Sequence, residues 1–362
     1  MSDATKENAR HAWAGFCDAL KSTGDVILAE NTADAALDVP EGFRFLTRAL
    51  RYVLEKSVEG NDLCFPWLVR SSHENLKLLS DSPDYHYRLA NIDGRYDYKL
   101  SGTRGGADLV AVSTYGPGGA GVECQGTLQE PDLKINADGT FEVVLSARQQ
   151  PGNWLPMKEN ASFMQLRNIF SSHRRDSPSI VTLQRIGGPA TPTPYPFDRL
   201  AADLKSASMQ LAMTAPRVAK FTRDLRENAH NDFDHDQSLW RASGGNADTY
   251  YVQGYWEIAD DEALLVDCPL PSCSYFSFQL NNVWAESLDY LHHTIHKTSH
   301  NSQLRADGSV RYVIAHRDPQ IDADWLDTAG HRSGTMVWKW NAVAETPQPI
   351  ARKLKLSELK VL

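Results

Sequence analysis

The segment ADGTFEVVLSARQQPGNWLP (137–156) has a counterpart much later in the chain, ADGSVRYVIAHRDPQIDADWLD (306–327). Both begin with Ala-Asp-Gly, continue with strand-like alternation, and pass through Arg and Pro to an Asn/Asp-Trp-Leu turn. The tryptophans of the two turns, Trp154 and Trp325, lie 171 positions apart. Repeat proteins of the solenoid type have periods of about 20–50 residues, so this spacing indicates a duplicated domain.

Short strand-like segments surround both copies of this motif. From Tyr85 to Phe170 the apolar period is two, and segments rich in Val, Tyr and Phe are separated by Gly, Asp and Pro. Residues 247–340 repeat the pattern. It is typical of antiparallel strands joined by tight turns. We therefore predict a mainly β protein with helical additions, in which a duplication produced two related β-sandwich domains with helices before and between them.

The helices are predicted from apolar residues at helical spacing. Residues 1–80 are predicted to be helical, with one apolar stripe in EGFRFLTRALRYVLEK (41–56). Residues 196–230 predict a helical pair, the second helix capped by Thr214 with Pro216 in its first turn. The predicted division of the chain is 1–84 (N-terminal helical region), 85–186 (first sandwich), 187–246 (linker and helical pair), 247–345 (second sandwich, bearing the site) and 346–362 (surface C-terminal tail).

Composition limits the class of protein. A chain of 362 residues exceeds the size at which one core keeps growing, which again favours two domains. The net charge of −9 argues against a nucleic-acid partner, and no apolar run approaches the ~18 residues of a membrane span. The N-terminal segment lacks a secretory signal, and the five cysteines form no CxxC or zinc spacing. We therefore expect reduced thiols and a cytoplasmic protein.

The two Asn/Asp-Trp-Leu turns and the closing block DGSV…DWL…GTMVWKW (307–340) resemble the family catalogued as domain of unknown function 1214. The second copy (247–340) resembles it best, and a weaker related copy lies around residues 85–171. The resemblance implies jelly-roll-like β-sandwiches. It implies no activity, because the family has none established. The turn of the first copy is Asn-Trp-Leu-Pro at 153–156, whereas the turn of the second copy is Asp-Trp-Leu-Asp at 324–327.

A candidate site is predicted in the second copy. The stretch from Phe276 to Trp340 holds six of the chain's 12 histidines and four of its nine tryptophans. Polar groups among large aromatics are what a ligand pocket needs. We take Asp289 as the general acid or base, with Glu286 second, because a carboxylate held among aromatics has a raised pKa. In the alternative interpretation Asp289 caps a turn and Asn282 satisfies backbone groups.

The remaining candidates complete this hypothesis. His296 or His331 would exchange protons with Asp289, Asn282 and Arg317 would orient the substrate, and Trp284 would stack on it. His331 is a stronger candidate than Trp325, because the tryptophan is shared by both copies and fits a structural turn. The predicted residues are, as catalytic groups, Asp289, His296 and His331, and, as substrate-binding groups, Asn282, Trp284, Tyr290, Arg317 and Trp325.

Metal and cofactor sites have weaker patterns. His292, His296 and His300 would share one face of a helix, as zinc ligands do in HExxH, but they lie between predicted strands and the Glu is missing. A His-carboxylate metal site with Asp289 stays open as an alternative; the prediction is no metal. A triad of Ser287, His331 and Asp289 lacks a G-x-S-x-G elbow, and no GxGxxG or GxxxxGK[ST] occurs.

We therefore predict a cofactor-independent enzyme that uses acid–base chemistry, as a hydrolase, lyase or isomerase, on a small hydroxylated, glycosidic or aromatic compound. The alternative is a non-catalytic ligand-binding or scaffolding β-sandwich protein. The enzyme is favoured because titratable groups are concentrated where binding alone would require only aromatics and amides. The expected partner is a small molecule rather than nucleic acid or membrane, and a homo-oligomer is left open.

Overall fold

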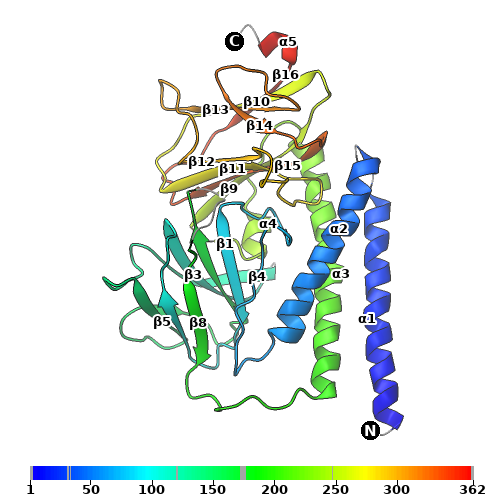
Figure 1. Cartoon of the computed structure of the whole chain (residues 1–362), viewed down its shortest axis with the longest axis vertical. Helices are drawn as coiled ribbons and strands as arrows, with labels where there is room; N and C mark the ends of the chain where they lie inside the picture. The colour runs from blue at the N-terminus through cyan, green and yellow to red at the C-terminus, as the bar shows by residue number, and fades with distance from the viewer. Residues whose placement is uncertain are drawn as a thin grey trace.

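The computed structural model describes residues 3–30, 32, 34–119, 121–171, 177–246 and 248–359. Two β-sandwiches lie one above the other, and three long helices run along one side of the pair (Figure 1). The helices are α1 (Asp3–Ala29), α2 (Ala35–Leu54), which continues as the π-helical turn η1 (Glu55–Glu59), and α3 (Phe197–Asn228). The short helix α4 (Ser238–Ala242) precedes the second sandwich.

The first sandwich has two four-stranded sheets, with strand orders β1-β7-β3-β4 and β6-β5-β2-β8. Its strands are β1 (Tyr85–Asn91), β2 (Tyr98–Thr103), β3 (Leu109–Gly118), β4 (Gly121–Gln129), β5 (Thr140–Ser146), β6 (Trp154–Pro156), β7 (Phe163–Ile169) and β8 (Ile180–Arg185). The apolar residues of both sheets meet in one core, which includes Val143, Leu145 and Leu166.

The second sandwich repeats this topology strand for strand. Its strands are β9 (Thr249–Glu257), β10 (Glu262–Cys268), β11 (Tyr275–Leu280), β12 (His296–Thr298), β13 (Val310–Ala315), β14 (Asp324–Asp327), β15 (Ser333–Asn341) and β16 (Ile350–Lys355). Its sheet orders are β9-β15-β11-β12 and β14-β13-β10-β16, so each strand of the first sandwich corresponds to the strand eight places later. The predicted fold, two related β-sandwiches with helices before and between them, is confirmed.

The Asn/Asp-Trp-Leu turns of the two copies form the short strands β6 and β14. Each pairs in parallel with the preceding strand, so these two pairs depart from the predicted antiparallel pattern. The indole N–H of Trp154 donates to the carbonyl of Ser146 at 3.0 Å, and that of Trp325 donates to the carbonyl of Ala315 at 2.9 Å. In each copy, the carbonyl that accepts this bond lies two residues after the residue with which the tryptophan is paired in the sheet. These equivalent bonds give both tryptophans a structural role.

The Asn-to-Asp difference between the copies is accommodated locally. In the first copy Oδ1 of Asn153 accepts the backbone N–H of Lys134 at 2.9 Å, and its amide group donates to two carbonyls. In the second copy Asp324 accepts the N–H of Gln303 at 2.7 Å, and its other oxygen accepts the ammonium of Lys297 at 2.6 Å. The acceptor function is therefore kept, and the extra negative charge is offset by a lysine.

The C-terminal segment predicted as a separate tail belongs to the second sandwich. Strand β16 pairs antiparallel with β10 along its whole length, as β8 pairs with β2 in the first copy. It is an edge strand with the sequence IARKLK, and most of its residues are exposed. Charged edge strands are common because they discourage further pairing. The sequence of such a strand shows little apolar alternation. For this reason the predicted end of the second sandwich, residue 345, falls before β16.

Two helix predictions are wrong. Residues 197–228 form one helix instead of a pair, because a continuous buried face that includes Leu211, Ala215 and Val218 outweighs the backbone hydrogen bond that Pro216 cannot make. Residues 60–84 are irregular rather than helical. Their polar groups serve other elements instead: the backbone N–H of Ser80, for example, donates to the carbonyl of Ala285 in the second sandwich.

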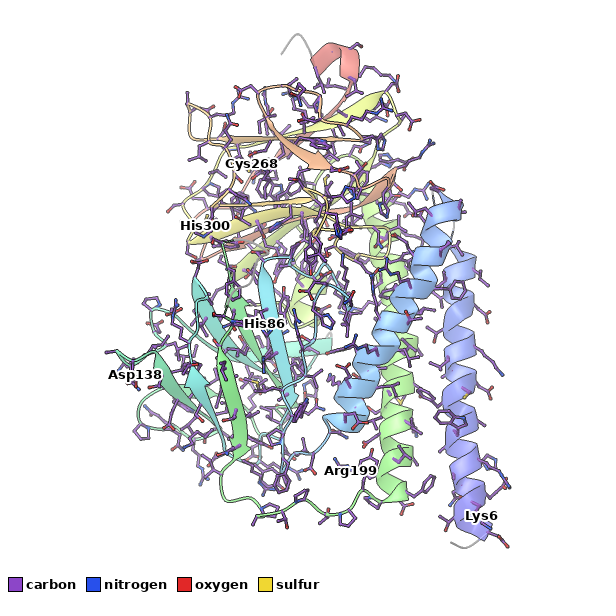
Figure 2. The ribbon with its side chains drawn as sticks, viewed as in Figure 1. Lys6, His86, Asp138, Arg199, Cys268 and His300 are labelled. Carbon is purple, nitrogen blue, oxygen red and sulfur yellow. The ribbon has the colours of Figure 1, made fainter. Side chains whose placement is uncertain are left out.

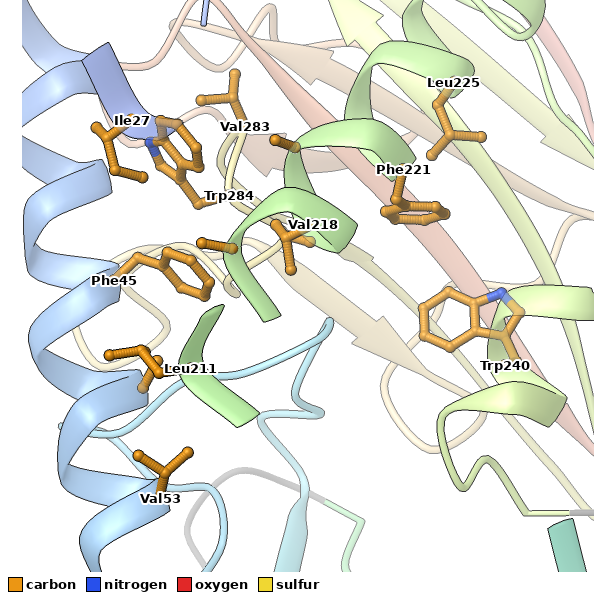
Figure 3. Packing of buried hydrophobic residues seen from close by; sticks show 14 of the residues in the cluster. Ile27, Phe45, Val53, Leu211, Val218, Phe221, Leu225, Trp240, Val283 and Trp284 are labelled. Carbon is orange, nitrogen blue, oxygen red and sulfur yellow. The ribbon is translucent and has the colours of Figure 1, made fainter. Parts of the chain in front are cut away.

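The helices pack against the second sandwich through strands β9 and β15 and through a loop that follows β11. Trp284 is fully buried there, stacks on Phe45 of α2 at 6.1 Å between ring centroids, and donates its indole N–H to the carbonyl of Asp38 (Figure 3). Gly42 allows this approach, since an added Cβ would lie 2.7 Å from the Trp284 ring. None of the described helices combines the length and apolar character of a membrane span.

Candidate functional site

Asp289, predicted as the general acid or base, is an exposed turn residue. Its carboxylate bonds to Nδ1 of His292 at 2.8 Å and accepts the backbone N–H of Leu291 at 3.0 Å. Partial burial acts to raise its pKa, but these two hydrogen bonds outweigh burial, and the pKa is lowered. The prediction of a raised pKa is therefore wrong for Asp289, because the turn carries this side chain out of the aromatic environment of the preceding strand.

His296 lies at the boundary between the two sandwiches. The side chain is buried, and its Nε2 is 3.1 Å from the carboxylate of Asp84. The phenol of Tyr275 donates to the same carboxylate. Burial acts to raise the pKa of Asp84, but His296 and Tyr275 hold it below its ordinary value. Figure 2 labels His86 of the first sandwich and His300 of the second, which lie on either side of this boundary.

His331 and Asn282 are brought together by Glu41 of α2, which sequence reasoning missed. The Glu41 carboxylate lies 2.9 Å from Nε2 of His331 and accepts the Asn282 amide at 2.9 Å. The same amide also bonds to Glu286 at 3.3 Å, and Arg48 donates to Glu286 at 2.8 Å. This buried network joins helix α2 to the second sandwich.

Glu286 has the raised pKa that was predicted for Asp289. Burial raises it to about 7, although the Arg48 guanidinium acts in the opposite direction. Burial lowers the pKa of His331, but the hydrogen bond to Glu41 raises it more, so that the net shift is upward. For Glu41 burial acts to raise the pKa, and His331 lowers it more. Within this network, Glu286 therefore changes charge near neutral pH.

The remaining predicted residues lie elsewhere. Trp284 is enclosed by the helices, Tyr290 is buried beneath the ammonium of Lys77 at 4.8 Å, and Arg317 is exposed. Trp325 has the structural role described above. Of the predicted residues, only Asn282 and His331 share a hydrogen-bonding partner among the described side-chain contacts. The structure does not gather the predicted set around one pocket.

A cavity that the sequence did not predict lies between the two sandwiches. Its volume is about 240 Å³. Both sandwiches, α2, η1 and the segment 243–246 after α4 contribute to its wall. An open groove of about 1160 Å³ adjoins it and shares six wall residues with it. These shared residues are Val122, Trp240, Gly245, Asn246, Thr249 and Tyr251. The groove and the cavity therefore adjoin along this shared wall.

The cavity wall is built from equivalent parts of the two copies. Arg167 of β7 is paired across the sheet with Tyr87 of β1, and Lys339 of β15 is paired with Tyr251 of β9. Since β7 corresponds to β15 and β1 to β9, the two sheets contribute a basic residue and a tyrosine from matching strands. The two sandwiches thus face each other across the cavity with similar surfaces.

The basic residues of this wall have different surroundings. The ammonium of Lys339 donates to the carbonyl of Ser80, to Oγ of Ser82 at 2.6 Å and to Oε1 of Gln279 at 3.2 Å. Burial lowers its pKa to about 8, although Asp84 acts to raise it. An ammonium group has three N–H donors, so all the donors of Lys339 are engaged, two by the segment before β1 and one by the neighbouring strand β11.

Arg167 uses only part of its donors in contacts with the described residues. Its guanidinium donates to the phenol oxygen of Tyr115 at 3.0 Å and to the carbonyl of Gly244 at 2.8 Å. These bonds use two of its five N–H groups. Burial acts to lower the pKa of Arg167, but the surrounding phenols raise it above its ordinary value. Arg167 therefore keeps its charge inside the protein.

A signal in the sequence could have found these two residues. The strand MQLRN (164–168) of the first copy aligns with MVWKW (336–340) of the second, and each has a basic residue three positions after Met. A basic residue at the same position of a matching strand in both copies, among large apolar side chains, indicates a buried cation. The histidine-rich segment, which is much more conspicuous, contributes no residue to the cavity wall.

Comparison with known proteins agrees with this fold. The chain belongs to the DUF1214 family, whose members are described as proteins of unknown function. The family's model matches residues 119–173, which lie mainly in the first sandwich, the copy that the sequence indicated as the weaker resemblance. The matched range contains Asn153-Trp154-Leu155-Pro156 and Arg167.

An uncharacterised protein from Burkholderia cenocepacia is 36% identical, with a TM-score of 0.93 and coverage of 98% of this chain and 100% of that protein. A protein from Vibrio parahaemolyticus is 9% identical, with a TM-score of 0.49 and coverage of 86% of this chain and 97% of that protein. No curated protein matches the chain.

Proposed function

We propose that this protein binds a small organic molecule in the cavity between its two sandwiches. The observation that carries the proposal is the composition of the wall, where aromatic rings from both sandwiches and from the helical elements surround a few polar groups. These rings belong to Tyr52, Tyr85, Tyr87, Phe163, Trp240 and Tyr251. Ligand sites are concave, mostly apolar, and often located between domains.

The second candidate function is an acid–base enzyme acting in the same cavity. Lys339 supports it, because an amine with a pKa of about 8 can exchange protons near neutrality. The surface position of Asp289 gives no support to its role as the general base. We expect Asp289→Asn to leave ligand affinity, and any turnover of a bound compound followed by mass spectrometry, unchanged. The cytoplasmic location expected from the sequence remains part of the proposal.

Filling the cavity from its wall tests the binding proposal. Val122 lines both groove and cavity, so the larger ring of Val122→Trp should occupy space that a ligand needs. Ile180→Trp adds the same ring at an exposed edge-strand position outside both and serves as the control. Thermal stabilisation is measured with neutral, anionic and cationic single-ring compounds, together with mass spectrometry of molecules released when the purified protein is denatured.

Compounds that stabilise the wild type and Ile180→Trp, but not Val122→Trp, would support the proposal. Equal stabilisation of all three proteins would place the compounds outside the cavity and refute it. So would an absence of both stabilisation and released molecules.

A further inference from the structure

Arg167 is a buried cation without a carboxylate partner in the described part of the chain. Its residue is 5% exposed, and its two hydrogen bonds go to neutral oxygens. No ion pair with a carboxylate is found for it among the described residues, where its bonds go to Tyr115 and Gly244. A buried charge is costly unless it is paired, and arginine cannot avoid the cost by losing its proton. A negatively charged group in the cavity would supply the missing partner.

Lys56 adds a second cation to the same wall. Its ammonium lies 5.1 Å from the centroid of the Phe163 ring, and its one described hydrogen bond, to Oε1 of Gln210, is 3.4 Å long. Burial lowers its pKa. No ion pair with a carboxylate is found for Lys56 among the described residues either. An anion near Arg167 would therefore be attracted by two uncompensated basic groups.

The carboxylate in the wall does not offset these charges. Asp81 lines the cavity, but its two oxygens accept the backbone N–H of Ser287 at 3.0 Å and its hydroxyl at 2.9 Å. It is therefore held toward the second sandwich. Ser243, by contrast, has a buried hydroxyl oxygen in the cavity wall with no hydrogen-bond partner in the described structure. The wall thus offers donors and positive charge together.

We propose that the ligand of this cavity is a small aromatic carboxylate, with its carboxylate against Arg167 and Lys56 and its ring among the aromatic side chains. This inference rests on the binding function proposed above. A guanidinium fork matches the two oxygens of a carboxylate. The volume of about 240 Å³ is below the usual range of ~300–1,000 Å³, which favours a compact, single-ring compound.

Four compounds of similar size test the assignment by isothermal titration calorimetry at pH 7. Benzoate carries ring and charge, benzamide keeps the ring without the charge, cyclohexanecarboxylate keeps the charge without the aromatic ring, and phenyl phosphate replaces the carboxylate. Charge-assisted hydrogen bonds contribute about 1.5–3 kcal/mol, which corresponds to roughly 10–100-fold in affinity. We expect benzoate to bind at least tenfold more tightly than benzamide, and more tightly than cyclohexanecarboxylate and phenyl phosphate.

Two variants locate the charge that the carboxylate meets. Arg167→Met and Lys56→Met should each weaken benzoate at least tenfold and leave benzamide unchanged. Arg185→Met removes a guanidinium that stacks on Tyr96 outside the cavity, and should change neither. The comparison of the four compounds on the wild-type protein does not depend on the variants being folded.

The outcomes separate this inference from the proposed function. Equal binding of benzamide and benzoate, abolished by Val122→Trp, would overturn the carboxylate assignment and leave the binding function standing. Tighter binding of phenyl phosphate or cyclohexanecarboxylate would overturn it in the same way. If none of the four binds and no small molecule is released from the denatured protein, both the inference and the proposed function fail.

Discussion

Replacing Glu286 by Gln should change how the stability of this protein depends on pH. Oε2 of Glu286 bonds to Arg48 and Asn282, whereas Oε1 is buried without a partner in the described structure. An unpartnered buried oxygen makes the charged form costly, and burial raises the pKa from 4.5 to about 7. Glutamine keeps an acceptor for Arg48 but has no proton to lose in this range.

The magnitude follows from the difference between the folded and unfolded pKa. Between pH 4.5 and about 7 the folded protein holds a proton on Glu286 that the unfolded chain has released. The contribution of Glu286 is therefore fully present below pH 4.5 and is lost as pH rises through about 7. At about 1.36 kcal/mol per pKa unit, the wild type should lose about 3 kcal/mol relative to Glu286→Gln across this window.

Urea unfolding followed by tryptophan fluorescence at pH 4.5 to 8 measures this difference, because pH effects of other groups are shared by both proteins. Asp289→Asn is the control, whose stability should differ from that of the wild type by a constant amount across this pH range. The pKa of Asp289 is lowered, so its contribution is present above the ordinary value and is lost as pH falls through the lowered one. Parallel stability profiles for the wild type and Glu286→Gln would show that Glu286 titrates normally and would refute the burial argument.

Three further predictions concern the fold. Gly42→Ala should destabilise the protein by about 1–3 kcal/mol, because the new Cβ would lie 2.5 Å from a methyl carbon of Ile27. Gly15→Ala, in open space on a helix, should stabilise it by about 0.5–1 kcal/mol. Urea unfolding of the two variants measures this difference. Trp154→Phe and Trp325→Phe each remove one equivalent indole bond and should cost a similar ~0.5–1.5 kcal/mol in urea unfolding. Deleting residues 346–362 removes the partner strand of β10 and should cause aggregation in gel filtration; a stable monomer would contradict the role of β16.

The fold was predictable because its evidence is local and repeated. Alternation with period two identified most strands, and the two Asp-Gly…Trp-Leu segments revealed the duplication. The errors fall where a contact distant in sequence decides the structure. Pro216 stays inside one helix because the buried face on both sides of it is continuous, and β16 is recognised as a strand only through its pairing with β10.

The site was harder to predict because it depends on how the domains meet. Side chains close in sequence, such as Asp289 and His296, diverge to the surface and to the domain boundary. Glu41, which joins His331 to Asn282, lies some 240 positions or more before either of them. Local composition can find titratable groups, as it did for Glu286, but it cannot tell which of them face a cavity.

The duplication itself explains why the cavity lies between the copies. Matching strands of the two sandwiches present Arg167 beside Tyr87 and Lys339 beside Tyr251, so two similar cationic surfaces face each other. Facing surfaces of like charge repel unless the charge is compensated. The charge of Lys339 is compensated by the hydrogen bonds that it donates to the second sandwich and to the segment before β1, and Asp84 acts on it as well. Around Arg167 no described carboxylate does so, and the charge that remains is the one that a ligand would neutralise.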